Sequence, residues 1–177
     1  MTRSRDESEQ ILRARAEALA RPVTPVAVFT DELEINVLSF GNERYGIPTS
    51  HVLEVLALRD LTPVPCTPPF VLGILNYRGR ILTVLDLRPL FELPGNGSTN
   101  GHRVVAVSAA GITFGIFAET ASVPITLDAA ELAPPPMTLP ADRQALIRGV
   151  TREMVSVLDL EALARDPRIQ VNDEWGE

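Results

Sequence analysis

The sequence has no lysine, since all 16 of its basic residues are arginines. Lysine forms Schiff bases and completes the common phosphate-binding loop, so the composition excludes both kinds of site. Cys66 is the single cysteine, which excludes an internal disulfide and fits a reducing compartment. With only His51 and His102 beside it, the chain also lacks the ligands for a closed zinc site built from cysteine and histidine.

The sequence also has no long apolar run and no excess of positive charge. No stretch approaches the ~18 residues that cross a bilayer, and the N-terminal MTRSRDESEQ lacks the apolar core of a signal peptide. We therefore expect a cytoplasmic protein without direct membrane insertion. A formal net charge of -7 argues against wholesale nucleic-acid binding. What the chain does have is 177 residues, 45% of them hydrophobic, which is enough to bury a globular core.

From residue 35 onward, short β-rich runs alternate with turn residues. Ile35–Phe40 and Tyr45–Ile47 flank Gly41–Asn42 at hairpin spacing. Prolines interrupt the chain around 63–69 and 134–136, so these stretches are expected to be loops or sheet edges. The pattern predicts a mostly β protein of the barrel or sandwich type. Further runs of strand length occupy 52–58, 81–85, 103–108 and 112–117.

Two parts of the chain resemble each other. Arg80–Glu92 aligns with Glu153–Arg165, and both contain Val-Leu-Asp-Leu followed by a leucine three residues on. Tyr45-Gly-Ile47 likewise resembles Phe114-Gly-Ile116. We interpret the chain as two copies of one β unit of about seventy residues, divided at the glycine-rich run 94–101.

The aspartates that the two copies share, Asp86 and Asp159, each precede a short helical pattern. We expect each to cap a short helix rather than to form a pair of catalytic acids, which would need a shared cleft. His51, His102 and Cys66 have no neighbouring residue that would make them catalytic, so we expect structural roles, with Cys66 as a small packing residue. No catalytic residue, metal site or cofactor is predicted.

The two copies differ at one place. Only the first contains Asn76-Tyr-Arg-Gly79 before its final strand, and the second is shorter there. We expect Asn76 and Gly79 to form a turn, with Tyr77 and Arg78 displayed at its tip. Tyrosine and arginine are frequent anchors of protein interfaces. The extra residues therefore predict a protein-binding site that the fold itself does not need.

These motifs resemble those of the CheW family of chemotaxis coupling proteins. The resemblance rests on Val52-Leu-Glu-Val55, on Pro69-Phe-Val-Leu-Gly-Ile-Leu-Asn-Tyr-Arg-Gly79 and on Val84-Leu-Asp-Leu87, and it covers roughly residues 35–167. It implies two intertwined five-stranded SH3-like barrels formed by a duplicated β unit, with short helices. It also implies a non-enzymatic protein that bridges the CheW-like regulatory domain of the histidine kinase CheA to the cytoplasmic hairpin tip of chemoreceptors.

The predicted organisation has three parts. Residues 1–34 form an N-terminal helical arm and a proline-containing linker, since Ser4 and Glu7 make a capping box. Residues 35–167 form the CheW-like domain, with a first barrel at about 35–93, a second at about 102–160 and a C-terminal helix at about 160–166; residues 168–177 form a tail. We expect the arm to be dispensable for folding, because an isolated helix of its length is marginally stable.

Carried over by position, the resemblance implies seven partner-binding residues: Val52, Glu54, Gly73, Asn76, Tyr77, Arg78 and Gly79. Because Glu54 and Arg78 carry opposite charges within one copy, we predict a salt bridge between them. Tyr77 stands where the family usually has leucine, and Leu72 where a basic residue is frequent, so the identity of the partner stays open. The alternatives are a coupling protein of a chemotaxis-like pathway with an output other than motility, and a β-barrel module that binds a peptide or ligand.

Overall fold

The computed structural model describes residues 31–94 and 102–169. The predicted N-terminal helix, most of the glycine-rich run and nearly all of the predicted tail lie outside the described residues. The elements are β1 (Glu32–Phe40), β2 (Glu43–Pro48), η1 (Thr49–His51), β3 (Val52–Ala57), β4 (Val71–Tyr77), β5 (Arg80–Leu85), α2 (Leu87–Phe91), β6 (Arg103–Ala109), β7 (Ile112–Ala118), β8 (Thr120–Ala121), β9 (Ile125–Asp128), η2 (Ala129–Glu131), α3 (Ala141–Gln144), β10 (Ile147–Val150), β11 (Val155–Leu158) and α4 (Leu160–Arg165). The predicted mostly β fold is confirmed.

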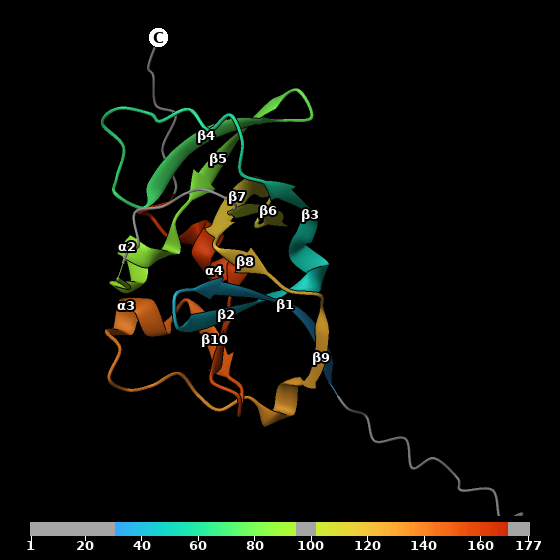
Figure 1. Cartoon of the computed structure of the whole chain (residues 1–177). Coiled ribbons are helices and arrows are strands. Elements are labelled where there is room, and N and C mark those ends of the chain that lie inside the picture. Colours follow the sequence, from blue (N-terminus) through green and yellow to red (C-terminus); the bar gives the residue numbers. More distant parts are fainter. Residues whose placement is uncertain (1–30, 95–101, 170–177) are drawn as a thin grey trace, which may run out of the picture. The chain divides into compact units, whose positions relative to one another are not determined.

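The strands form two sheets, which occupy the upper and lower halves of the view in Figure 1. The five-stranded sheet has the order β3-β6-β7-β5-β4. The six-stranded sheet has the order β10-β11-β2-β1-β8, and β9 pairs with β1 beside β8. Most neighbours are antiparallel, but β5 runs parallel to β7 and β11 runs parallel to β2.

Each sheet takes strands from both copies of the repeat. The β6–β7 hairpin of the second copy lies between β3 and β5 of the first, and the β1–β2 hairpin of the first copy lies between β9 and β11 of the second. The copies are therefore intertwined, as the resemblance implies. The assignment of one barrel to 35–93 and one to 102–160 stays a prediction, and both ranges contribute strands to both sheets.

The repeated motifs meet where the parallel strands pair. Val84 lies opposite Gly115, and Val157 lies opposite Gly46. A Cβ atom on Gly115 would lie 2.6 Å from Cγ1 of Val104, and one on Gly46 would lie 2.7 Å from Cδ1 of Ile35. Real side chains do not approach so closely in a packed core. The glycines therefore leave room for the side chains of Val104 on β6 and Ile35 on β1, which pack beside the parallel pairs.

An isolated backbone bridge brings the two edges of each sheet together. In the five-stranded sheet, the N–H groups of Thr62 and Ile74 each donate to the other's carbonyl, at 2.8 and 2.9 Å. Ala133 and Val150 do the same in the six-stranded sheet, at 2.9 and 2.8 Å. In each sheet, the segment that follows the strand at one edge thus meets the hairpin at the other edge, β3 meeting β4–β5 and β9 meeting β10–β11. This closure supports the predicted barrels, and their SH3-like character stays a prediction.

Both predicted helix caps are confirmed. A side-chain oxygen of Asp86 accepts from the N–H of Arg88 at the start of α2, and Oδ1 of Asp159 accepts from the N–H of Ala162 at the start of α4. The predicted packing role of Cys66 is wrong, because the structure leaves this thiol exposed. Within the described part of the chain, no helix has the length and apolar character that crossing a membrane requires.

Candidate protein-binding surface

The predicted salt bridge joins the two edges of the five-stranded sheet. Glu54 lies on β3 and Arg78 follows β4, and these strands are the first and last in the order of the sheet. Nη2 of Arg78 lies 2.8 Å from Oε2 of Glu54, so the predicted contact is confirmed. Because the pair is exposed, it contributes little to stability, about 0–1 kcal/mol. Its position beside the sheet edges is what makes it a candidate for recognition.

A two-residue turn presents Arg78. Arg78 and Gly79 both have positive φ angles, 53° and 80°, and the flanking residues Tyr77 and Arg80 pair across the hairpin. Two-residue hairpin turns favour such angles because they match the twist of the strands. Oδ1 of Asn76 accepts from the N–H of Gly79 at 2.8 Å and holds the turn closed.

The prediction that Asn76 is a turn residue is wrong, because Asn76 lies in β4 and pairs with Ile81. The residues that only the first copy contains are not an added loop. They lengthen a hairpin, since β4 and β5 have 7 and 6 residues, whereas β10 and β11 have 4 each. The sequence reading also did not identify β4 as a strand, because its glycine and its polar end obscure the β pattern.

Arg78 is held on two sides. Its Cζ atom lies 5.2 Å from the centroid of the Tyr77 ring, in addition to its contact with the Glu54 carboxylate. A cation this close to an aromatic face is attracted to it. Tyr77 is half-buried against the core rather than displayed, whereas the Arg78 side chain is 71% exposed. The guanidinium is therefore fixed in place and open to a partner.

Gly73 and Val52 lie underneath this surface. Gly73 is buried with a φ of 151°, and a Cβ atom there would lie 2.5 Å from the carbonyl oxygen of Thr62. The glycine thus allows β4 to reach the residue that closes the sheet. Val52 is half-buried and packs against the core. We expect both residues to affect a partner through the position of the hairpin, and their part in binding stays a prediction.

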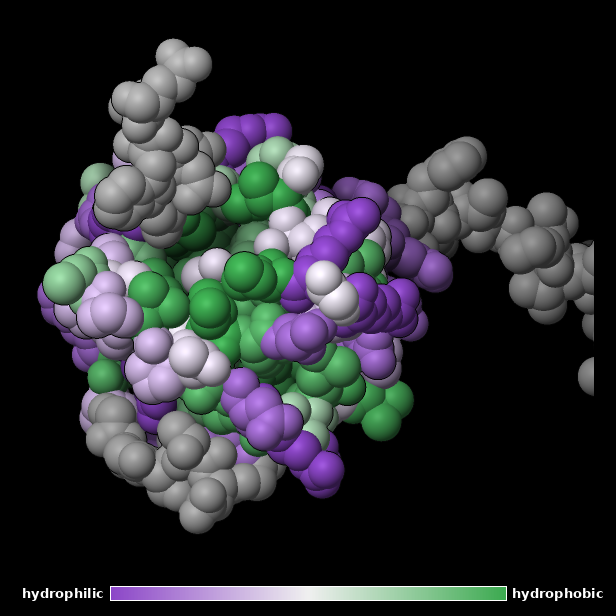
Figure 2. Space-filling model, turned by 90° about the horizontal axis from the view of Figure 1, so that it is seen from above, coloured by the Kyte–Doolittle hydropathy of each residue, from purple (hydrophilic) through white to green (hydrophobic). Residues whose placement is uncertain are grey.

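Exposed apolar side chains next to the ion pair are residues that the sequence reading missed. Leu53 is 49% exposed and Ile81 is 77% exposed. Together with Tyr77, Arg80 and Leu82, they line a cavity of about 470 Å³. Figure 2 looks down on the end of the molecule that carries β4 and β5, where hydrophobic side chains gather near the middle and hydrophilic ones border them. The run Arg78-Gly-Arg80 followed by the apolar Ile81 was the sequence signal that could have pointed to this cavity.

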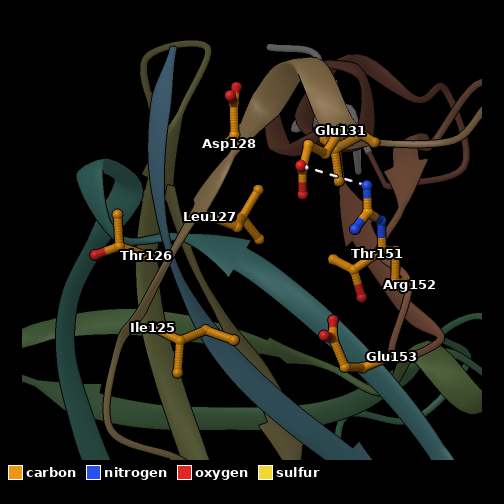
Figure 3. A pocket seen from close by; sticks show the side chains of 9 residues that line it. Ile125, Thr126, Leu127, Asp128, Glu131, Thr151, Arg152 and Glu153 are labelled. Carbon is orange, nitrogen blue, oxygen red and sulfur yellow. Dashed lines mark hydrogen bonds and ion pairs between the residues drawn. The ribbon is translucent and has the colours of Figure 1, made fainter. Parts of the chain in front are cut away.

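The six-stranded sheet has a second cavity, of about 390 Å³, which the sequence did not predict. It lies between the β9–η2 segment and the loop that precedes β11 (Figure 3). Ile125 and Leu127 line it from β9, and Nη2 of Arg152 lies 3.4 Å from Oε1 of Glu131 at its rim. Among the described residues, no three His, Cys, Asp or Glu side chains come together in a way that could hold a metal ion.

Comparison with known proteins shows which family the chain is similar to. The family model described as a CheW-like domain matches residues 34–168. The chemotaxis protein CheW of Treponema pallidum is 27% identical over 153 residues, which cover 82% of this chain and 90% of that protein. Protein FrzA of Myxococcus xanthus is 31% identical over 142 residues, which cover 77% and 88%. The crystal structure of the scaffolding protein TtCheW from Thermoanaerobacter tengcongensis is similar with a TM-score of 0.67 and 30% identity, covering 74% of this chain and 86% of that one.

Proposed function

This chain belongs to the CheW-like domain family, and we propose that it is a non-catalytic, cytoplasmic scaffold that couples chemoreceptors to a CheA-type histidine kinase. The observation that carries the proposal is the match of the family model to residues 34–168, which include both sheets and the candidate surface. One solved structure to which the chain is similar, TtCheW, is that of a scaffolding protein, and this supports a role in assembly rather than in catalysis.

The geometry of the five-stranded sheet supports a binding role. Its two edges meet at an exposed ion pair, and apolar side chains surround that pair. Interfaces commonly combine an arginine or aromatic anchor with an apolar centre. We propose that Glu54, Tyr77 and Arg78 contact the partner, with Asn76 and Gly79 holding the turn. The regulatory domain of the kinase and the cytoplasmic tip of the receptors are the partners that the family resemblance implies.

Reconstitution of the signalling complex tests the proposal. Autophosphorylation of the CheA-type kinase of the same organism is measured in membranes that contain its chemoreceptors, with and without the full chain. We expect the chain to sediment with the membranes and to place the kinase under control of the receptor ligand. A kinase that responds equally well without the chain, together with no binding of the chain to kinase or membranes, would contradict the proposal.

The same assay, together with a gene deletion scored for motility, separates the alternatives. A coupling protein of a chemotaxis-like pathway would bind its kinase and receptors in the same way, while deletion of its gene would leave motility unchanged. A module that binds a peptide or ligand independently of signalling would bind neither kinase nor receptor membranes.

A further inference from the structure

Arg80 stands where the interior of the five-stranded sheet opens to the surface. It is the first residue of β5, and by the alternation of a strand it shares a face with the buried residues Leu82 and Val84. It pairs across the hairpin with Tyr77 and is itself exposed. The cavity of about 470 Å³ that Leu53 and Leu82 line therefore has this arginine at its mouth.

The described residues do not neutralise the charge of Arg80. Its side chain has no hydrogen bond and no ion pair among them, and the carboxylate of Glu54 is engaged by Arg78. Arg59 and Asp60 lie with Arg80 around a neighbouring cavity of about 380 Å³. The described residues that line the two cavities or form the ion pair thus include three arginines, Arg59, Arg78 and Arg80, and two carboxylates, Asp60 and Glu54, although the whole chain has a net charge of -7.

We infer that Arg80 selects the partner of this surface, and that the partner is a protein which places a carboxylate on Arg80 and an apolar side chain in the adjoining cavity. The inference rests on the proposed function and names the chemistry of the surface that it recognises. The guanidinium group of arginine is well suited to binding a carboxylate, since its planar N–H groups match the two carboxylate oxygens. A locally positive surface on an acidic protein also attracts an acidic partner over a distance.

The cavity provides the apolar half of the recognition. Leu53, Ile81 and Leu82 form its apolar wall, and its volume lies within the ~300–1,000 Å³ that is usual for binding pockets. Ile81, next to Arg80, is 77% exposed in the free protein, so a partner would remove apolar surface from water as well as pair the charge.

Arg148 offers a matched control. It lies on β10 in the six-stranded sheet, is exposed and, like Arg80, has no ion pair within the described residues. The substitutions Arg80→Glu and Arg148→Glu therefore change the net charge of the chain by the same amount at different ends of the fold. Arg80→Met is the third variant, because it keeps an unbranched apolar stem and removes the charge and the N–H donors without adding a negative charge.

The test measures binding of the full-length wild-type protein and the three variants to the CheA-type kinase of the same organism and to its chemoreceptor-containing membranes, at low and high salt. We expect Arg80→Glu to weaken binding to at least one of them by about tenfold or more, Arg80→Met to weaken it less, and Arg148→Glu to change it by about twofold or less. The salt dependence of the remaining binding should also fall in Arg80→Glu. Thermal unfolding midpoints should match that of the wild type, because the side chain is exposed.

Two results overturn the inference and leave the proposed function intact. One is binding of both probes by Arg80→Glu as tightly as by the wild type. The other is an equal loss in Arg80→Glu and Arg148→Glu, which would show an effect of net charge alone. If the wild-type protein binds neither kinase nor receptor membranes, the proposed function fails and the inference fails with it.

Discussion

The two sheets are built on the same plan, and the points at which they differ separate folding from function. Each sheet surrounds a hairpin from the other copy, pairs a glycine with a valine across parallel strands and closes through an isolated bridge. Buried features that both sheets share are candidates for a role in folding. Features present in one sheet are candidates for function.

The hairpins that close the two sheets show the first difference. The five-stranded sheet ends in a two-residue turn whose arginine pairs with Glu54 at 2.8 Å. The six-stranded sheet has a four-residue loop, 151–154, and its Arg152 pairs with Glu131 at 3.4 Å. Both sheets thus have an exposed ion pair at their closure, but only the first has a long hairpin that carries Tyr77 beside the arginine.

The second difference lies at the start of the two short helices. Oε1 of Glu161 in α4 accepts from the N–H of Ala110, at the turn between β6 and β7. The same position in α2 is Arg88, which is buried and lies 2.8 Å from Oδ2 of Asp86 and 3.8 Å from Oε1 of Glu119. Glu119 in turn accepts from the N–H of Gly41, at the turn between β1 and β2. Helix α4 thus contacts the β6–β7 turn directly through Glu161. Helix α2 is linked to the β1–β2 turn indirectly, because its buried Arg88 pairs with Glu119, which accepts from Gly41.

Arg88→Met should have the largest effect on stability. The substitution leaves the carboxylate of Asp86 buried without its cation, and removal of one partner of a buried pair commonly costs ~3–5 kcal/mol. Glu161→Gln keeps an acceptor at the corresponding position and should cost about 1 kcal/mol or less. Chemical denaturation of both variants checks the comparison. Equal losses would contradict the predicted difference between the buried arginine of α2 and the glutamate of α4.

Gly73→Ala and Gly149→Ala should come next, since each glycine precedes the residue that forms the closing bridge. A Cβ atom on Gly73 would meet a backbone oxygen at 2.5 Å, at a φ that disfavours alanine, so we expect a loss of about 2–4 kcal/mol. A Cβ atom on Gly149 would lie 2.9 Å from the carbonyl oxygen of Ala133, and a loss of about 1–3 kcal/mol is expected. Unfolding midpoints that rank the two variants in the opposite order would contradict this account of closure.

Tyr45 gives a stability effect that depends on pH. Burial, with a smaller contribution from the Glu43 carboxylate, raises the pKa of Tyr45 to about 12 from its usual 10.0. The folded state thus holds the phenol proton more tightly than the unfolded state. Its contribution to stability is complete below pH 10 and is lost as the pH rises toward 12, by up to about 2 kcal/mol.

The counterpart of Tyr45 in the second copy is Phe114, which cannot ionise, and this suggests the control. Tyr45→Phe should weaken the fall in unfolding free energy between pH 10 and 12 while leaving the protein folded at pH 7. An equally steep fall in the variant would assign the alkaline loss to other groups.

Local sequence patterns were enough to predict the parts of the fold that depend on neighbouring residues. The Val-Leu-Asp-Leu repeat, the two helix caps and the Glu54–Arg78 contact are all present in the structure. The exchange of hairpins between copies was expected only from the family resemblance, because the residues of a strand do not specify which strand it pairs with. The close approach of Gly73 to Thr62 depends on that exchange, and no local pattern predicted it.

Only part of the candidate surface was predicted, because the rest also depends on how the strands are arranged. Arg78 and Glu54 were found because a motif and opposite charges marked them, whereas Arg80 and Ile81 looked like the start of an ordinary apolar strand. Their exposure follows from the length of the β4–β5 hairpin, which extends beyond the strands beside it. Cys66 was predicted to be a small packing residue because free cysteines are usually buried, but the proline-rich segment around it runs over the surface.

The most direct test of the central claim compares Arg78→Ala with Arg152→Ala, the arginines of the two exposed ion pairs, for both folding and binding. Each substitution should lower the free energy of unfolding by less than about 1 kcal/mol, since exposed pairs contribute little. Arg78→Ala alone should weaken binding to the CheA-type kinase or to receptor membranes, by about 2 kcal/mol, as expected for an interface anchor. Unchanged binding in Arg78→Ala, or a collapse of its denaturation midpoint, would contradict the claim that this ion pair serves recognition.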